Sequence, residues 1–346
     1  MKPVSWLLFV LLFIVRAALA QDCERAVGSD CLRAFDLPGA AGRLHYYSSR
    51  GPGEGMPQAA LVVLHGHPRD AGRSFAAGLE ATQAAGQLPD TLVIAPLYQV
   101  GDAARCHSPG VPAARAGDAL WTCASWLAGE PSLGAHPVSA FAALDALVVE
   151  LVRQWPGLRQ ITLAGFSAGA QMLQHSIGFA APPPAGVEVR YVIADPGSWL
   201  YFDPLRPVAG GAGYAFRQPA PGCPGYDDWK YGTHALPAWL PRSAAEARAR
   251  YGTARIDYLV GERDDSAAKG AYYRVLDKSC AAQLQGPFRL QRAQAYVAYE
   301  KALLKPVQPR RMVVVPGCGH DVSCVLTSPE ARNVLFPAVS SSQPLR

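Results

Sequence analysis

The chain has 346 residues, of which 50% are hydrophobic and 17% are charged, and its formal net charge is +5. That length and apolar content are sufficient for one large globular domain with a well-buried core. The mild charge and the lack of a Lys/Arg run exclude nucleic acid as an expected partner.

The first twenty residues predict a secretory signal peptide. Lys2 precedes an uncharged, largely apolar run over residues 3–15, and Ala18-Leu19-Ala20 suits cleavage after Ala20. This run is too short to span a bilayer, which makes a membrane anchor the weaker alternative. We therefore expect a secreted or periplasmic protein without a stable membrane anchor. Cleavage removes Lys2 and Arg16 and lowers the formal charge from +5 to +3.

All eight cysteines follow the predicted cleavage site. An even number of cysteines in an exported chain predicts disulfide bonds. Proximity in sequence favours Cys23 with Cys31, Cys106 with Cys123, and Cys318 with Cys324, although the connectivity stays open because eight cysteines allow about 105 pairings. The remaining two are Cys223 and Cys280.

Eight strand-like segments alternate with helix-like ones along the chain. Short polar-apolar alternations predict edge strands at 32–35 and 44–47. A continuous apolar run predicts a buried strand at 60–64, and short, mainly apolar segments predict buried strands at 91–96 and 161–164. Further strands are predicted at 187–194, 256–260 and 311–315. Helical spacing of apolar residues predicts helices at 74–85, 138–154 and 288–304, and another directly after Ser167. This alternation predicts an α/β fold with a mostly parallel, doubly wound sheet covered by helices on both faces.

Two Gly/Pro-rich segments are too long to be simple connections. They run from about 98 to 137 and from 197 to 255, and the second is rich in Trp, Tyr and Phe. We interpret residues 21–346 as a single domain with these two insertions.

The segment Gly165-Phe166-Ser167-Ala168-Gly169 reads as a nucleophile elbow between a strand and a helix. A tight turn lifts the serine hydroxyl off the backbone, and small residues two positions before and after it let the strand and the helix pack closely. Because the bare pentapeptide is a weak signal, its strand, turn and helix context carries the interpretation.

Two further polar segments follow late strands. The strand at 256–260 leads into Gly261-Glu262-Arg263-Asp264-Asp265, and the strand at 311–315 leads into Gly319-His320. Parallel sheets place their sites at the carboxyl ends of strands, so an acid and a histidine are expected near Ser167. Along the chain the serine comes first, the acid second and the histidine last. This is a known order for the residues of an acyl-transfer site.

With these motifs and His65-Gly66-His67, the chain resembles the α/β-hydrolase superfamily over roughly residues 61–324. It is most similar to secreted serine esterases and polyester-depolymerase-like hydrolases. It departs from lipases with a His-Gly-Gly-Gly motif, because His67 and Pro68 replace glycines.

The resemblance implies a catalytic triad of Ser167, Asp264 and His320, with the backbone N–H groups of His67 and Ala168 as the oxyanion hole. Asp265 is the alternative acid, but Asp264 fits the Gly-x-x-Asp spacing. The resemblance also implies a lid-like role for the aromatic insertion, with packing of its aromatic side chains against the body of the domain as the alternative. No cofactor and no metal are implied. The expected reaction is cleavage of a small-molecule or polymeric carboxylic ester through an acyl-enzyme on Ser167.

Three alternatives remain. The fold also carries inactive binding modules, and the same triad could cleave amides or peptides. The pair His65 and His67 with Asp70 suggests zinc, but Arg69 stands where such a cluster needs an acid. The sequence identifies neither the substrate-binding residues nor the oligomeric state.

Overall fold

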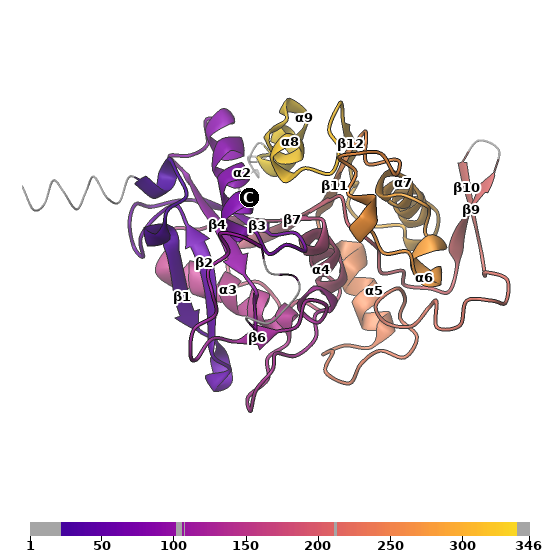
Figure 1. The fold of residues 1–346 in the computed structure, drawn as a ribbon, viewed down its shortest axis with the longest axis horizontal. Helices are drawn as coiled ribbons and strands as arrows, with labels where there is room; N and C mark the ends of the chain where they lie inside the picture. Colours follow the sequence, from indigo (N-terminus) through magenta and orange to yellow (C-terminus); the bar gives the residue numbers. More distant parts are fainter. Residues whose placement is uncertain (1–21, 102–105, 107, 211–212, 338–346) are drawn as a thin grey trace, which may run out of the picture.

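The computed structural model describes residues 22–101, 106, 108–210 and 213–337 (Figure 1). The predicted signal peptide and its cleavage site lie outside these residues. Of the helices within the described ranges, none has both the length and the apolar character needed to cross a membrane.

An eight-stranded sheet forms the centre of the molecule, in the order β1-β2-β4-β3-β7-β8-β11-β12. β1 and β2 are antiparallel, as are β2 and β4, and every later neighbouring pair is parallel. The strands match the eight predicted segments: β1 (Leu32–Asp36), β2 (Arg43–Ser48), β3 (Ala59–Leu64), β4 (Thr91–Leu97), β7 (Gln160–Phe166), β8 (Glu188–Ala194), β11 (Ile256–Gly261) and β12 (Met312–Val315).

Helices cover both faces of the sheet, which explains why its central strands are continuously apolar. The helices of the described residues are α2 (Ala71–Ala84), α3 (Ala140–Gln154), α4 (Ala168–Ser176), α5 (Ala244–Thr253), α6 (Cys280–Gln283), α7 (Arg289–Tyr299), α8 (Val322–Thr327) and α9 (Pro329–Leu335). In β3, Leu61 and Val63 face the core layer that contains α8 and α9, whereas Val62 and Leu64 face the layer that contains α3 and α4. Figure 1 shows α2, α8 and α9 above the sheet and α3 and α5 below it.

The helix predicted at 288–304 is α7 followed by a π-helical turn over Glu300–Leu304. α5 was not predicted from the sequence, although Ser243 and Glu246 form a capping box at its start. The short helices α8 and α9 were not predicted either.

The first insertion packs against the sheet through two tryptophans, Trp121 and Trp126, both fully buried. It contains β5 (Gln99–Val100), β6 (Leu120–Trp121) and a 3₁₀ turn over Trp126–Ala128. The insertion therefore extends the hydrophobic core instead of lying free over the surface.

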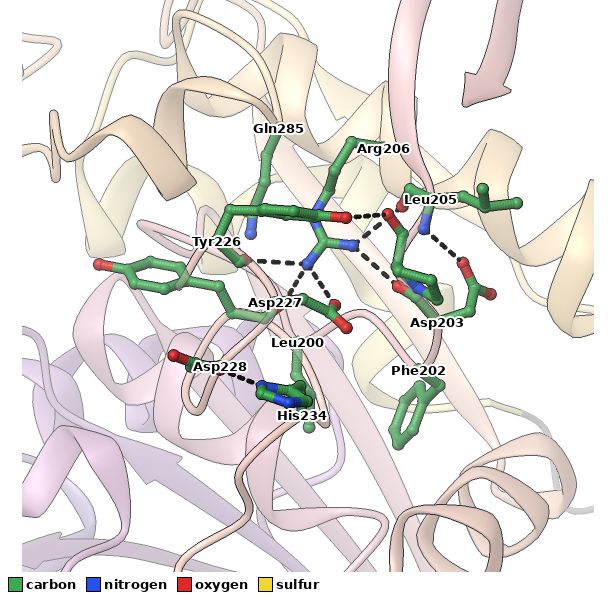
Figure 2. A network of polar contacts seen from close by, with 12 residues as sticks. Leu200, Phe202, Asp203, Leu205, Arg206, Tyr226, Asp227, Asp228, His234 and Gln285 are labelled. Carbon is green, nitrogen blue, oxygen red and sulfur yellow. Dashed lines mark hydrogen bonds and ion pairs between the residues drawn. The ribbon is translucent and has the colours of Figure 1, made fainter. Parts of the chain in front are cut away.

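The second insertion is held by aromatic packing and by one buried arginine. Trp199 stacks on Tyr296 of α7, with ring centroids 4.4 Å apart. Arg206 lies at the centre of a polar network, where it forms an ion pair with Asp227 at 2.9 Å and donates to the Asp203 and Tyr226 carbonyls (Figure 2). The insertion also contributes the hairpin β9 (Arg206–Gly210) and β10 (Gly213–Arg217), at the right edge of Figure 1.

All eight cysteines form disulfide bonds, which confirms the three pairings favoured by sequence proximity. The fourth bond joins Cys223 of the second insertion to Cys280. This bond connects the insertion to the segment between β11 and α7.

Candidate active site

Ser167 occupies a strained turn between β7 and α4, as the pentapeptide predicts. Its backbone has φ 57° and ψ −119°, a conformation unusual for a residue other than glycine. The Ser167 N–H donates to the Ala194 carbonyl at 2.9 Å, which ties the turn to the end of β8. The hydroxyl is therefore held at the carboxyl edge of the sheet, at the N-terminus of a helix.

Two glycines make this turn possible because neighbouring backbone atoms leave no room for a side chain. A β-carbon at Gly165 would lie 2.5 Å from the Gly169 carbonyl oxygen. A β-carbon at Gly169 would lie 2.5 Å from the His65 carbonyl oxygen and 2.7 Å from that of Leu64. The small residues around Ser167 thus bring the end of β3 close to α4.

The structure brings together the three side chains singled out from the sequence. Ser167 Oγ lies 2.8 Å from His320 Nε2, and His320 Nδ1 lies 2.6 Å from Asp264 Oδ2. Asp264 and His320 are buried, while Ser167 is partly accessible. Asp265, the alternative acid, is exposed. The three side chains thus form a continuous chain of hydrogen bonds from the partly accessible Ser167 hydroxyl to the buried Asp264 carboxylate.

Arg289, the first residue of α7, was not identified from the sequence. Its Nη1 donates to Asp264 Oδ1 at 3.0 Å and to the Ala271 carbonyl at 2.8 Å. Burial raises the pKa of Asp264, but hydrogen bonds and charges from His320 and Arg289 outweigh burial and hold this pKa below its ordinary value. Asp264 is therefore an ionised carboxylate with a partner on each oxygen.

His320 is neutral near pH 7. Burial lowers its pKa and Arg289 lowers it further, while the hydrogen bond to Asp264 opposes these effects, and the net shift is downward. Its loop is fixed by the His320 N–H, which donates to the Gly270 carbonyl at 3.0 Å, and by the disulfide between Cys318 and Cys324. A neutral imidazole that faces a hydroxyl through Nε2 can accept its proton.

The turn after β3 lies directly over the serine. A β-carbon at Gly66 would lie 3.5 Å from Ser167 Cβ. His65 orients this turn, since its Nε2 accepts the Tyr98 N–H at 3.2 Å and its Nδ1 donates to the Gly66 carbonyl at 2.9 Å. Burial lowers the pKa of His65 to about 4, so the ring is neutral. In the described part of the chain, neither the His67 nor the Ala168 backbone N–H donates to another backbone group.

Both ring nitrogens of His65 are engaged, which leaves none to pair with His67 in a metal site. A second group of three, Asp195, Asp264 and His320, brings ligand-type atoms within 4.8 Å of one another. In this group, Asp264 is already hydrogen-bonded to the Arg289 cation, and His320 is already hydrogen-bonded to the Ser167 hydroxyl. The contacts are those of a hydrogen-bonded triad, and we assign no metal to these residues.

A cleft of about 100 Å³ opens beside Ser167. Its apolar lining comes from Phe166, Tyr272, Val275 and Val322, and its polar lining includes Asp70, Arg73 and Ser74. Among the described residues that line it, none comes from the second insertion, whose aromatic side chains Trp199, Tyr201 and Phe202 are buried in the core. A hollow of about 390 Å³ adjoins this cleft and shares Pro68, Asp70 and Arg73 with it. Two others, of about 380 and 860 Å³, lie at the amino ends of the strands, away from Ser167.

No protein-family model and no curated protein matches the sequence. Among solved structures, the chain is similar to LpqC, a poly(3-hydroxybutyrate) depolymerase from Bordetella parapertussis, with a TM-score of 0.56 and 20% identity over 88% of this chain and 87% of that one. It is also similar to poly(aspartic acid) hydrolase-1 from Sphingomonas sp. KT-1, with a TM-score of 0.53 and 17% identity over 88% and 98% of the two chains. At these identities the similarity establishes the fold, which is that of the α/β-hydrolases, as predicted.

Proposed function

We propose that this α/β-hydrolase-fold protein is an exported serine hydrolase that cleaves carboxylic esters through an acyl-enzyme on Ser167. The observation that carries the proposal is the line of hydrogen bonds from Ser167 Oγ through His320 to Asp264, at 2.8 and 2.6 Å. It begins at a hydroxyl that borders an open cleft. These distances are within the range needed for proton transfer between a nucleophile and its base.

In the proposed mechanism, Ser167 Oγ attacks the ester carbonyl while His320 Nε2 accepts the hydroxyl proton. His320 then donates this proton to the leaving alkoxide, and a water molecule attacks the acyl-enzyme by the same route. Asp264 keeps the proton of the neutral ring on Nδ1 and stabilises the imidazolium that forms. No cofactor takes part in these steps.

The developing oxyanion would be held by the backbone N–H groups of His67 and Ala168. Gly66 lies against Ser167 Cβ, which places the His67 turn beside the nucleophile. Loss of one such donor typically raises the barrier by about 3 to 4 kcal/mol. The N-terminus of α4 adds a favourable dipole at the same point.

Export is supported by the four disulfide bonds, because such bonds persist in oxidising compartments. The two similar structures, a poly(3-hydroxybutyrate) depolymerase and a poly(aspartic acid) hydrolase, place polymers among the substrates to test. A cleft of about 100 Å³ is smaller than typical small-molecule pockets of roughly 300–1,000 Å³. A long substrate would therefore insert one acyl unit and extend over the surface.

The first experiment is covalent labelling with a fluorophosphonate. We expect the wild type to be labelled and Ser167→Ala not to be, with Ser323→Ala as a matched control that keeps the label. A folded wild-type protein that takes no label would favour the inactive binding module over the enzyme.

The second experiment separates esters from amides. Chromogenic esters of graded acyl length, polyester oligomers and matched anilides are compared on the wild type and on Ser167→Ala. We expect ester cleavage that depends on Ser167. Faster cleavage of anilides or peptides than of matched esters would instead support the amide-hydrolase alternative.

A further inference from the structure

Asp195 is a buried acid beside the candidate triad that the mechanism above does not use. It directly follows β8, has φ 50°, and is 0% exposed. Its Oδ1 accepts the Gly261 N–H at 3.0 Å, while its Oδ2 is buried and receives no donor from the described residues. A fully buried carboxyl group with one oxygen that receives no donor is unusual and needs a physical explanation.

The neighbours of Asp195 are another acid, a neutral histidine and one cation. Asp195, Asp264 and His320 each contribute an atom to a group that spans at most 4.8 Å. Asp264 is already bonded to Arg289 on one oxygen and to His320 on the other. With both acids ionised, Arg289 would have to balance two buried negative charges.

An unbalanced buried carboxylate is costly enough that the group takes up a proton instead. The contacts decide which acid holds it. Asp264 has a guanidinium and an imidazole as partners, whereas Asp195 has only one neutral backbone N–H. Ionisation is therefore more favourable at Asp264.

We propose that Asp195 is a neutral carboxylic acid that donates a hydrogen bond to the Asp264 carboxylate and thereby positions the triad acid. Two carboxyl groups can bond to each other only when one of them carries a proton. Burial, the charge of Asp264 and the hydrogen bond to Asp264 raise the pKa of Asp195 well above its ordinary value, against smaller effects of the Gly261 N–H and Arg289.

Asp195 would act through Asp264 and would not contact the substrate. Its O–H occupies a lone pair of Asp264, limits rotation of that carboxylate, and reduces the negative charge that His320 experiences. The proton stays on Asp195 throughout the cycle. This role rests on the proposed function, but the protonation state of Asp195 does not, and the two can be tested separately.

The protonation state is tested by infrared spectroscopy on the full-length folded protein at pH 7. The difference spectrum between the wild type and Asp195→Asn should contain the C=O stretch of one protonated carboxylic acid. The same band should appear when Ser167→Ala is compared with Ser167→Ala/Asp195→Asn, where no catalysis occurs. A carboxylate band in its place would overturn the proposal, whether or not the protein is an esterase.

The positioning role is tested by the pH profile of kcat/KM with a chromogenic ester. Asparagine keeps an N–H donor and stays neutral, so Asp195→Asn should leave the apparent pKa of His320 within about 0.3 of the wild type. Asp195→Ala removes the donor and exposes His320 to the full charge of Asp264, so this pKa should rise. We expect kcat to fall about tenfold in Asp195→Ala with KM unchanged, and to recover largely in Asp195→Asn.

Two outcomes would contradict this role. A drop of about one pKa unit in Asp195→Asn would mean that a negative charge had been removed, hence that Asp195 is ionised. An Asp195→Ala variant with wild-type kcat and pH profile would mean that Asp195 only fills space. Should Asp195→Ala fail to fold, the infrared spectra and Asp195→Asn still decide the matter.

Discussion

Replacement of Gly169 by alanine tests whether close packing behind Ser167 sets the geometry of the site. The added β-carbon would lie 2.5 Å from the His65 carbonyl oxygen, about 0.9 Å short of the 3.4 Å of an ordinary contact. Both crowded groups are backbone, so α4 or the turn that carries His67 must move. Overpacking of this kind costs about 1–3 kcal/mol of stability.

The effect on catalysis should be about as large as the upper end of the effect on folding. A misplacement of about 1 Å typically lowers a rate by about a hundredfold, or roughly 2.7 kcal/mol in the barrier. We expect Gly169→Ala to lose about that much kcat on a chromogenic ester while KM changes little, because the oxyanion donors act mainly in the transition state.

The matched control is Gly252→Ala in α5. A β-carbon at that position meets no atom within 4 Å, so we expect unchanged kcat and a gain of about 0.5–1 kcal/mol in the free energy of unfolding. Both variants are measured by steady-state kinetics and urea denaturation. A folded Gly169→Ala variant with wild-type kcat would refute the packing argument.

Because burial lowers the pKa of His320, kcat/KM should rise with pH through a midpoint below the ordinary 6.5, and a midpoint above 7 would contradict a buried base. His175 is fully buried with both ring nitrogens unpartnered among the described residues, and burial holds its pKa well below 6.5. Because His175 takes up a proton only in the unfolded chain, the free energy of unfolding decreases as pH falls through 6.5, by about 2 kcal/mol at pH 5. Denaturation curves at pH 5 and 7.5 should show that His175→Leu no longer loses stability at the lower pH. The control His136→Gln, at an exposed histidine, should lose as much stability as the wild type. An equal pH dependence of stability in the two variants would count against a buried, neutral His175. Arg289→Met leaves the buried Asp264 without its cation and should reduce the free energy of unfolding by about 3–5 kcal/mol. It should also raise the apparent pKa of His320, which Arg289 lowers, and an unchanged pH profile would argue against the ion pair as a determinant of that pKa.

The parts of the fold that could be predicted are those encoded by local patterns. A strand covered on both faces, such as β3 (Ala59–Leu64), requires a continuous apolar run, and this run is visible in the sequence. Parallel strands share one carboxyl edge, so Ser167, Asp264 and His320 could be placed at that edge without knowledge of the packing.

Residues that depend on tertiary contacts could not be predicted in this way. Arg289 faces Asp264 only because α7 packs its first turn against the loop after β11, and a single arginine at a helix start carries no local signal. Asp195 did have a signal, since it is a polar residue at the carboxyl end of a buried strand. It was not singled out because Asp195-Pro196-Gly197 has the composition of a turn that closes the strand. The capping box at Ser243 and Glu246 was a further local signal that was missed.

The second insertion affects the cleft through the segment that carries Asp264. That segment, 262–280, supplies Asp264 and the two exposed side chains Tyr272 and Val275 that border the cleft. The insertion holds the end of this segment at two points, the disulfide from Cys223 to Cys280 and the hydrogen bond from Tyr231 to Asp277 at 2.5 Å. Cys223 and Tyr231 of the insertion therefore anchor the end of the loop that shapes the cleft. Substitutions at Tyr272 and Val275 are where acyl preference should change first.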